Sequence, residues 1–379
     1  MDNFIVSARK YRPARFTDVI GQEQVSETLK KALGSGHLAQ SFLFCGPRGV
    51  GKTTCARILA KAINCENPAP DKEPCGECSS CMSFSQNASF NIFELDAASN
   101  NSVEDIRNLV DQVRFAPQSG KYKVYIIDEV HMLSPNAFNA FLKTLEEPPS
   151  YAIFILATTE KHKIIPTILS RCQIFDFKRI SNNDIVRQLK IICEKEGIKA
   201  ESSALHTIAQ KADGGMRDAL SLFDKIISYS GKKLVYKDVI KNLNILDQDY
   251  YFKVTENFVT EDSSGVLKAF DTIIQNGFDG ETFILGLSEH FRNLLVSRND
   301  ETVELLEVGE DLKERYLQQA SLLHETFLLN ALNILNQCDV DYKMAKNKRL
   351  HVEMALLKVC FLHTQIENTI AVLLGEKKN

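Results

Sequence analysis

FLFCGPRGVGKTT, residues 42–54, decides the fold. Four apolar residues run directly into a glycine-rich loop, and apolar side chains at helical spacing follow, so the loop joins a buried strand to a helix. Glycines let successive backbone N–H groups turn toward phosphates, and the helix N-terminus adds positive potential. Lys52 would reach the outer phosphates, and Thr53 would ligate magnesium. We therefore predict a nucleotide-binding P-loop with these residues: Gly46, Pro47, Gly49, Val50, Gly51, Lys52, Thr53 and Thr54.

A second apolar run, VYII at 124–127, ends in the adjacent carboxylates Asp128 and Glu129. A site that hydrolyses nucleotides needs one acid for the magnesium shell and another that polarises the attacking water. We assign the metal role to Asp128 and the role of base to Glu129, so the two motifs predict hydrolysis as well as binding. The alternative is an exposed acid pair at a strand end. His131 lies close behind, but hydrolysis is explained without it, and we expect no catalytic role for it.

Short apolar runs alternate with helical patterns in the first half of the chain. The runs lie at 42–45, 91–95, 124–127, 153–157 and 173–177. Continuous apolar strands separated by helices indicate a parallel five-stranded sheet with helices on both faces. The helix after the third run is well marked, because Ser134 is a good N-cap, Pro135 suits its first position and Pro148 stops it.

The composition sets limits on the class of protein. Of 379 residues, 44% are hydrophobic and 25% charged, as in ordinary globular proteins. The formal net charge of -4 excludes a global basic excess, so any contact with DNA must use a local patch. No apolar run is long enough for a membrane helix, and the start of the chain lacks a signal-peptide pattern. We expect a cytoplasmic protein of about two or three domains, with no membrane partner and with reduced cysteines.

Four of the ten cysteines form the pattern C-x9-C-x2-C-x2-C in an insert after the P-loop helix. Cys65, Cys75, Cys78 and Cys81 are the members of this pattern. They offer four soft ligands with no obvious open position, which indicates structural zinc. A redox-active Cys-x-x-Cys pair and a site without metal are the alternatives. The remaining six are expected to be small apolar fillers: Cys45, Cys55, Cys172, Cys193, Cys338 and Cys360.

Beyond the last strand candidate the pattern changes. Apolar positions recur mainly at spacings of three and four, which is typical of helices. We therefore expect an α/β domain, a small helical domain and a longer all-helical domain. Their expected bounds are 1–180 with a zinc module at about 64–83, then 181–242, then 243–370, with a polar tail at 371–379.

Several motifs occur in the order typical of one family. They are ARKYRPARFTDVIGQEQV, GPRGVGKTT, the four-cysteine insert, ELDAASN, DEVHMLSPNAFNAFLKTLEEPP, ATTE, ILSRC and GGMRDALSL. The chain resembles the gamma/tau subunits of the bacterial DNA polymerase III clamp loader, densely over residues 1 to about 240 and more thinly through 346–360. The resemblance implies an AAA+ ATPase domain that binds ATP and magnesium, a helical lid and a collar domain that assembles into a pentameric ring.

The resemblance also assigns roles to two arginines. Arg171 in the SRC motif resembles the arginine finger that reaches the ATP of a neighbouring subunit. Arg217 in GGMRDAL resembles the second sensor of the lid. On the residues alone, Arg171 would be a solvated surface arginine, and Arg217 would form an ion pair with Asp218.

Smaller assignments follow from the same resemblance. Thr158 or Thr159 occupies the first sensor position, with Thr158 preferred, although a strand-end hydroxyl is the plain alternative. The N-terminal arm would wrap the adenine end of the site with Tyr11, Pro13 and Ile20. The segment 99–107 is expected to begin a helix capped by Ser99, whose polar side chains would face either DNA or solvent.

The function implied is that of a motor subunit that uses ATP at subunit interfaces to open the beta sliding clamp and load it onto primed DNA. Its partners would be the delta and delta-prime subunits and further copies of itself, near the nucleoid. No polymerase metal site is evident, so nucleotide addition would belong to another subunit of the DNA polymerase III holoenzyme. Contacts with polymerase or helicase stay open.

Three other functions use related chemistry. One is an AAA+ DNA translocase or branch-migration motor, against which the cysteine insert and the SRC motif count. Another is a scaffold that does not hydrolyse ATP, against which the intact P-loop and acid pair count. The third is a small-molecule kinase, which would need neither the finger and sensor arginines nor a helical collar.

Overall fold

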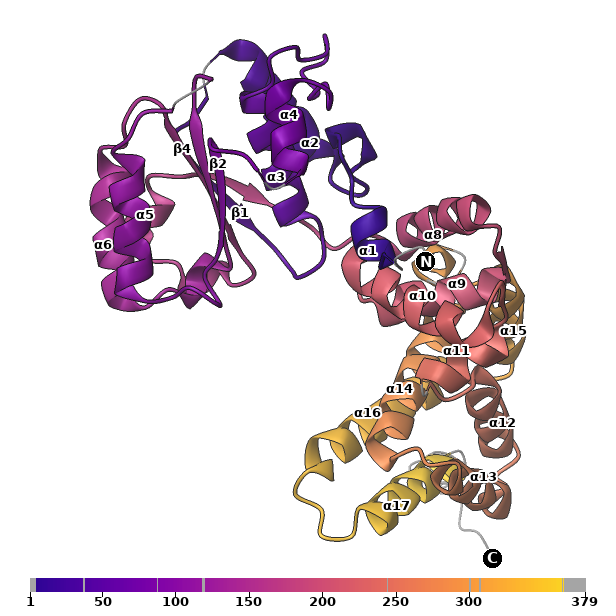
Figure 1. Cartoon of the computed structure of the whole chain (residues 1–379). Helices are drawn as coiled ribbons and strands as arrows, with labels where there is room; N and C mark the ends of the chain where they lie inside the picture. The colour runs from indigo at the N-terminus through magenta and orange to yellow at the C-terminus, as the bar shows by residue number, and fades with distance from the viewer. Residues whose placement is uncertain are drawn as a thin grey trace, which may run out of the picture. The chain divides into compact units, whose positions relative to one another are not determined.

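The computed structural model describes residues 5–36, 38–86, 88–117, 120–243, 245–299, 301–306, 308–362 and 364. The expected polar tail at 371–379 lies outside the described residues. The chain divides into two compact units, Met1–Gly197 with Ile208–Tyr229 and Ile198–Thr207 with Ser230–Asn379. We call them the sheet unit and the helical unit and describe each by itself (Figure 1).

The sheet unit contains the expected parallel sheet. Its strands are β1 (Ser41–Cys45), β2 (Ile92–Asp96), β3 (Lys123–Asp128), β4 (Ala152–Thr158) and β5 (Gln173–Asp176), in the order β2-β3-β4-β1-β5. All pairings are parallel, and Cys45 at the end of β1 lies opposite Thr158 on β4 and Asp176 on β5. The prediction of a five-stranded parallel sheet is confirmed, and the carboxyl ends of its strands meet at one edge.

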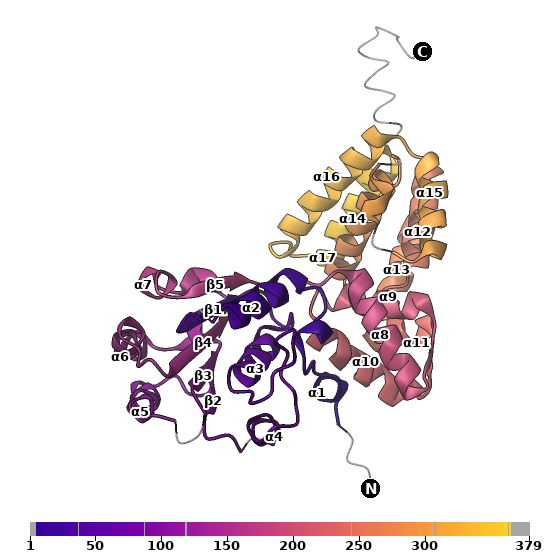
Figure 2. The same ribbon diagram turned by 90° about the horizontal axis from the view of Figure 1, so that it is seen from above.

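Helices cover both faces of this sheet, because alternate residues of each strand point to opposite sides. On one face Phe42 and Phe44 of β1 pack with α2 (Glu23–Ser35) and α3 (Lys52–Ile63). On the other face Leu43 packs with α5 (Val103–Val113), α6 (Pro135–Glu146) and α7 (Pro166–Leu169). Figure 2 shows the strands between these two groups of helices. The central strands β1, β3 and β4 are therefore buried almost throughout, whereas the edge strands β2 and β5 carry exposed polar residues.

Two helix starts test the capping predictions. α6 begins as expected, with the Ser134 hydroxyl accepting from Ala137 N at 3.3 Å and Pro135 in the first position. The prediction that Ser99 caps the next helix upstream is wrong, because α5 begins at Val103 with Ser102 as its N-cap. Ser99 instead lies in a turn after β2, where its N–H donates to Asp96 O at 3.2 Å.

In the described part of the chain, four further helices belong to the sheet unit, two of them short and two that follow β5 in the chain. They are α1 (Ser7–Lys10), α4 (Ser79–Ser85), α8 (Asn182–Glu196) and α10 (Met216–Ser230), with 3-10 turns η1 (Phe16–Asp18), η2 (Val130–Met132) and η3 (Lys161–Lys163). α9 (Ser202–Lys211) is divided between the two units. The change to helical structure after β5 agrees with the apolar spacing of the sequence.

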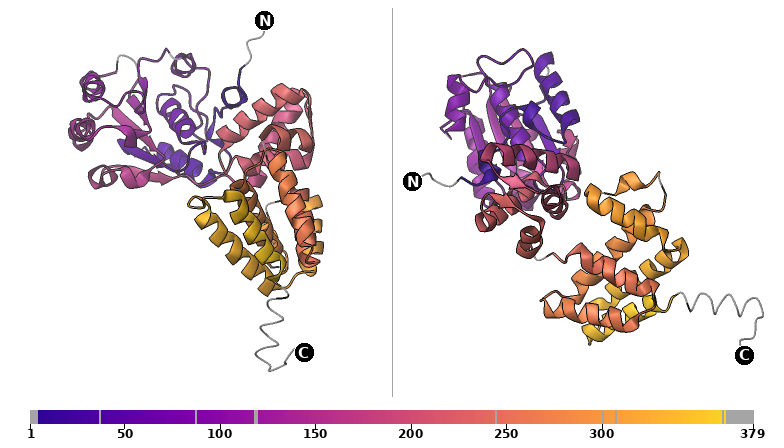
Figure 3. Two further views of the ribbon diagram at one scale, coloured as in Figure 1. Left: turned by 90° about the horizontal axis from the view of Figure 1, so that it is seen from below. Right: turned by 90° about the vertical axis from the view of Figure 1, so that its right-hand side faces the viewer.

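The helical unit is built on long helices around one apolar core (Figure 3). They are α12 (Gln248–Val259), α13 (Ser263–Gln275), α14 (Gly280–Val296), α15 (Glu310–Ser321), α16 (Glu325–Tyr342) and α17 (Lys348–Cys360), with a 3-10 turn η4 (Val303–Leu305). The shorter α11 (Tyr236–Leu243) precedes them, and its buried Val239 is not part of this core. A two-stranded parallel pair, β6 (Lys199–Ala200) with β7 (Lys233–Leu234), was not predicted. Among the described residues, no helix has the length and apolar character needed to cross a membrane.

Candidate functional site

The P-loop leaves β1 at Cys45 and ends where α3 begins at Lys52. Gly46, Gly49 and Gly51 have φ values of 148°, 78° and 108°, a region that side chains disfavour. A Cβ atom at Gly46 would lie 2.4 Å from Phe177 O, so only glycine fits there. No side chain caps α3. Its first N–H groups are therefore left for an anion, as expected of a phosphate-binding loop.

Lys52 is buried, with 5% of its surface exposed. Its Nζ donates to Gly46 O and Pro47 O, each at 2.7 Å. Burial lowers the pKa of Lys52, while the carboxylates of Glu129 and Asp128 act in the opposite direction. The lysine thus lies inside the loop, bonded to carbonyl groups that phosphate oxygens can replace.

The acid pair lies beside the start of α3. The Thr53 hydroxyl donates to Asp128 Oδ2 at 2.6 Å, so the two groups expected to hold magnesium touch each other. A hydroxyl and a carboxylate are the oxygen ligands that magnesium prefers, and this donor set fits the ion. Glu129 has a left-handed backbone (φ 48°) that turns it away from the strand. Its Oε2 accepts from Thr159 N at 3.2 Å and from Thr159 Oγ1 at 2.9 Å.

Thr158 and His131 form a second contact next to the acid pair. Thr158 is fully buried, and its Oγ1 lies 3.0 Å from His131 Nδ1. The other ring nitrogen, Nε2, lies 3.0 Å from Glu160 Oε2, and Nδ1 is 3.4 Å from Glu129 Oε2. The two threonines considered for the first sensor thus have different partners. Thr158 contacts His131, and Thr159 is hydrogen-bonded to Glu129.

A pocket gathers most of the predicted site residues. It is lined by the N-terminal arm (Ala8, Tyr11, Arg12, Pro13, Asp18, Val19 and Ile20), by loop residues 48–54, by Asp128 and Glu129, and by Ile180, Gln188, Met216, Arg217 and Leu220. Lys52, the acid pair, Tyr11, Pro13 and Arg217 thus come together although they are far apart in the sequence. Gly46, Pro47 and Thr158 are not among the lining residues.

Arg217 enters the pocket from the start of α10. Its backbone N–H donates to Gly49 O at 3.4 Å, so the start of α10 contacts the P-loop directly. Among the described residues no ion pair joins Arg217 to Asp218. Asp218 instead lies against the loop, because a Cβ added at Gly49 would be 3.0 Å from Asp218 Oδ2. The plain alternative of a surface pair with Asp218 thus loses its support.

Arg171 lies outside this pocket. It follows α7, and its side chain is 34% exposed. Its Nη2 lies 2.9 Å from Glu146 Oε1 at the end of α6, and its Nη1 donates to Thr167 O at 2.8 Å. Arg171 is therefore not among the residues that line this pocket of its own chain.

Sequence reasoning missed several lining residues. They are Ala8, Arg12, Asp18, Val19, Arg48, Ile180, Gln188, Met216 and Leu220. Burial lowers the pKa of Arg12, and the neighbouring positive charges of Arg57 and Arg217 add to that effect. Arg12 and Asp18 stand close to Tyr11 and Pro13 in the sequence, which is a usable signal. Nothing in the sequence marks Gln188 or Leu220, because only the packing of α8 and α10 brings them to the loop.

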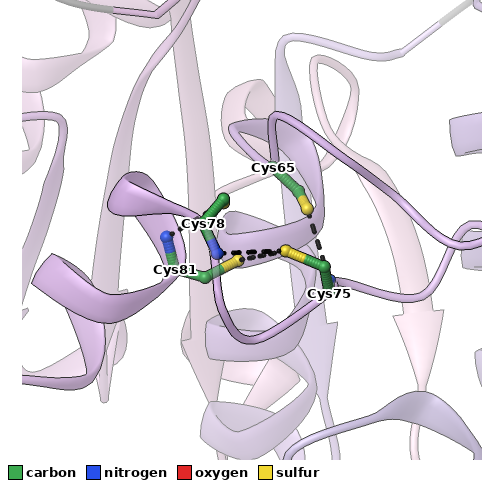
Figure 4. A group of neighbouring side chains, drawn as sticks. All are labelled: Cys65, Cys75, Cys78 and Cys81. Carbon is green, nitrogen blue, oxygen red and sulfur yellow. Dashed lines mark hydrogen bonds between the residues drawn. The ribbon is translucent and has the colours of Figure 1, made fainter.

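The four cysteines of the insert converge on one point (Figure 4). Their sulfur atoms all lie within 4.8 Å of one another, and Cys75 Sγ is 4.0 Å from Cys81 Sγ. Backbone N–H groups point at the sulfurs, from Cys75 to Cys65 Sγ at 3.3 Å and from Cys78 to Cys75 Sγ at 3.3 Å. The N–H groups of Cys78 and Glu77 lower the pKa of Cys75 to about 6, whereas burial raises the pKa of Cys81. Four soft donors in this arrangement fit zinc.

The other six cysteines are free, and five of them are buried. Burial raises the pKa of Cys45 to about 11 and of Cys55 to about 12, which keeps these thiols protonated and unreactive. They behave as the apolar fillers expected.

Models of protein families match the chain in three consecutive parts. Residues 21–181 match the model described as DNA polymerase III, delta subunit. Residues 184–232 match the ATPase lid domain of the DNA polymerase III clamp loader subunit, and residues 236–372 match domain III of DNA polymerase III subunits gamma and tau. Among solved structures, a RuvB Holliday junction branch migration motor from Thermotoga maritima aligns with a TM-score of 0.47 at 20% identity, over 66% of this chain and 79% of that chain.

Curated relatives are much more similar. DNA polymerase III subunit tau of Bacillus subtilis is 43% identical over 352 residues, which are 93% of this chain and 62% of the relative. DNA polymerase III subunit gamma of Buchnera aphidicola subsp. Baizongia pistaciae is 34% identical over 368 residues, which are 96% of this chain and 98% of the relative. The chain thus spans less than two thirds of the tau subunit but nearly all of the gamma subunit. The chain belongs to the gamma/tau family of DNA polymerase III clamp-loader subunits.

Proposed function

We propose that this chain is the ATP-hydrolysing motor subunit of a bacterial replicative clamp loader, which opens the sliding clamp and loads it onto primed DNA. The observation that carries the proposal is the pocket in which Lys52, Thr53, Asp128 and Glu129 meet the N-terminal arm and Arg217. The pocket brings together the phosphate-binding lysine, the two groups that would hold magnesium and the acid that would polarise water.

The contacts of the pocket support specific roles. Lys52 exchanges its two carbonyl partners for the outer phosphates of ATP. Thr53 and Asp128 would hold magnesium, which supplies Lewis-acid stabilisation of phosphate charge when bound. Glu129, held by Thr159, orients and polarises the attacking water. Arg217 would bind ATP from the lid side of the pocket.

The sensor threonine and the arm complete the proposed site. We keep Thr158 as the proposed first sensor, acting next to His131, and Thr159 as the residue that holds Glu129. The arm residues Tyr11 and Pro13 line the same pocket as Lys52. We propose that they contact the adenine end of ATP there.

Arg171 is proposed to act on a neighbouring subunit. An exposed arginine outside its own pocket is available to stabilise charge on the outer phosphate across an interface. ATP then favours one arrangement of adjacent subunits, and hydrolysis releases it. This would tie hydrolysis to assembly with the delta and delta-prime subunits, further copies of the chain, the beta clamp and primed DNA.

The bounds of the domains and the location of the protein in the cell are also proposals. Bounds of 1–180 for the ATPase domain, 181–242 for the lid and 243–370 for the collar are supported by family matches that change near residues 181–184 and 232–236. The cysteine cluster at about 64–83 would hold structural zinc. The protein would work in the cytoplasm, near the nucleoid.

The proposal is tested by steady-state ATP hydrolysis with and without delta, delta-prime, sliding clamp and primed DNA, for wild type and Arg171→Ala. Strong stimulation should appear only when clamp and primed DNA are both present. Arg171→Ala should lose about 100-fold or more of that stimulation while still binding ATP, because one charge-stabilising group is removed. Arg187→Ala, an exposed arginine paired with Asp184 on α8, is the matched control and should behave as wild type.

The opposite result would favour the translocase. Hydrolysis stimulated by DNA alone, and indifferent to the clamp and to Arg171, would reject the clamp-loading function. Wild-type protein that binds ATP but never hydrolyses it with all partners present would favour the scaffold.

A further inference from the structure

Glu73 is a buried carboxylate that the proposed mechanism does not use. It lies in the insert that carries the cysteines, and only 2% of the residue is exposed. A buried charge of this kind is costly unless its oxygens are fully bonded. Its partners should therefore show what the carboxylate is for.

All the partners of this carboxylate come from the N-terminal part of the chain. Its Oε2 accepts from Phe16 N at 2.8 Å, and its Oε1 accepts from Thr17 N at 3.0 Å. Lys30 Nζ on α2 lies 2.8 Å from Oε1. Phe16 and Thr17 begin the turn η1, which no side chain of its own N-cap stabilises. Glu73 thus supplies the cap that this turn lacks.

The turn held by Glu73 forms part of the nucleotide pocket. Asp18, Val19 and Ile20, which follow Thr17 directly, line the pocket. A Cβ added at Gly51 would lie 3.7 Å from Val19 Cγ1, so this part of the arm packs against the P-loop itself. Phe16 is buried in the same core cluster as Val50. Displacement of η1 would therefore change the wall of the pocket.

Glu73 is also tied to the cysteine cluster. One residue, Pro74, separates it from Cys75, and proline restricts the backbone between them. Cys75 N donates to Cys65 Sγ, and Glu73 O accepts from Ala69 N at 3.0 Å, which closes the loop before it. The position of the carboxylate thus depends on how the cysteines are held.

We propose that Glu73 is a positioning residue that couples the cysteine cluster to nucleotide binding. When zinc holds Cys65 and Cys75 together, Glu73 keeps η1 and the arm against the P-loop, and loss of either zinc or the carboxylate loosens the arm. The inference rests on the nucleotide site of the proposed function. According to this inference, the cysteine insert strengthens the binding of nucleotide to the pocket.

The decisive variant is Glu73→Gln in the full chain. The amide keeps the size of the side chain but places an N–H group against one of the two backbone donors, so one bond to η1 is lost. The dissociation constant of a fluorescent ATP analogue should rise about three- to tenfold, with zinc still bound. Hydrogen exchange at the amides of Phe16 and Thr17 should accelerate, while exchange in β4 stays unchanged. The KM for ATP should rise with little change in kcat, because no catalytic group is touched.

Two controls separate this effect from general damage. Asp71→Asn changes an acid of the same loop whose side chain is 55% exposed and 3.8 Å from Lys30. The amide oxygen of Asn can still accept from Glu73 N, as Asp71 Oδ1 does at 3.4 Å, so affinity and exchange should stay as in wild type. Removing zinc from the wild type with a chelator should reproduce the exchange change at Phe16 and Thr17 and the weaker binding. Removing zinc from Glu73→Gln should add little to the faster exchange or to the weaker binding that each change causes alone.

Two results would overturn the inference. One is a Glu73→Gln variant whose affinity for the ATP analogue and whose amide hydrogen exchange at Phe16 and Thr17 are both as in wild type. The other is zinc-free wild type whose arm exchange and nucleotide affinity are unchanged, which would show that the cluster and the pocket are independent. Failure of the proposed function looks different, because hydrolysis without dependence on clamp and primed DNA would reject clamp loading while leaving the coupling through Glu73 intact.

Discussion

Buried polar side chains are used in two different ways in the two units. In the sheet unit, Lys52 is buried but lines a pocket, and the partly buried Thr53 lines the same pocket and donates to Asp128. In the helical unit, His290 is 1% exposed and lies between Tyr316 OH at 3.2 Å and Gln319 Oε1 at 3.0 Å, and it is not among the residues that line the pocket of the sheet unit. The first arrangement can exchange its partners for a ligand, whereas the second is closed on itself.

The comparison teaches how to distinguish a site from a structural network. Burial and an altered pKa occur in both places, since burial lowers the pKa of Lys52 and lowers that of His290 to about 3. What differs is access. A buried polar group indicates function when it lines a pocket itself, and it indicates packing when it and its partners are all enclosed in the core.

The largest effect that this comparison predicts is a loss of ATP hydrolysis when Lys52 in the sheet unit is replaced. Lys52→Ala should reduce ATP hydrolysis about 100- to 1,000-fold, because the positive charge beside the outer phosphates is removed. Steady-state hydrolysis and binding of a fluorescent ATP analogue measure the change. Lys61→Ala, on the last turn of the same helix, is the control and should retain activity. Equal activity in Lys52→Ala and wild type would place hydrolysis elsewhere.

An intermediate effect is expected on the helical side. His290→Ala should lower the free energy of unfolding by about 3 kcal/mol, because it leaves a cavity and strips Tyr316 and Gln319 of a partner. Chemical denaturation measures the change. His324→Ala, an exposed histidine at the N-cap of α16, should cost much less. ATP hydrolysis should be preserved in folded His290→Ala, and a specific loss there would contradict the division between site and network.

The same histidine predicts a pH dependence. Burial depresses the pKa of His290 to about 3, so below its ordinary value of 6.5 the unfolded chain binds a proton that the folded chain does not. Its contribution to stability is therefore complete above pH 6.5 and is lost as pH falls toward 3. Unfolding measured across this range should lose part of its pH dependence in the variant His290→Gln. An unchanged pH profile would show that the pKa of His290 is the same in the folded and the unfolded chain.

The smallest effect concerns a helix start near the sheet. Ser102→Ala should lower the free energy of unfolding by about 1 kcal/mol, because the hydroxyl and Asp105 form a reciprocal capping box at α5. Ser99→Ala should change it by less, since Ser99 lies in the preceding turn. Denaturation of both variants against wild type is the measurement. A larger loss in Ser99→Ala would restore the original capping prediction.

Much of the fold followed from local pattern. The apolar runs predicted all five strands, because a parallel sheet covered on both faces requires continuous apolar strands. The P-loop and acid pair were found because their chemistry depends on adjacent residues. The cap at Ser99 failed for a physical reason. Asp96 accepts the N–H groups of Ala98 and Asn100 and forms a turn, so the helix can begin only after it.

Two further features depended on tertiary structure. Gln188 and Leu220 reach the pocket only because α8 and α10 pack beside the loop. Glu73 looks like any loop acid in the sequence, and only the fold buries it against the N–H groups of Phe16 and Thr17.

The sequence by itself therefore determined the strands, the glycine-rich loop, the acid pair, the cysteine cluster and the family. Each of these depends on residue type and short spacing, which act through local geometry and burial. Only the tertiary structure decided which distant residues line the pocket, which acid holds the N-terminal arm and which arginine stays outside. These depend on contacts between segments far apart in the chain, and no local pattern encodes the distance between them.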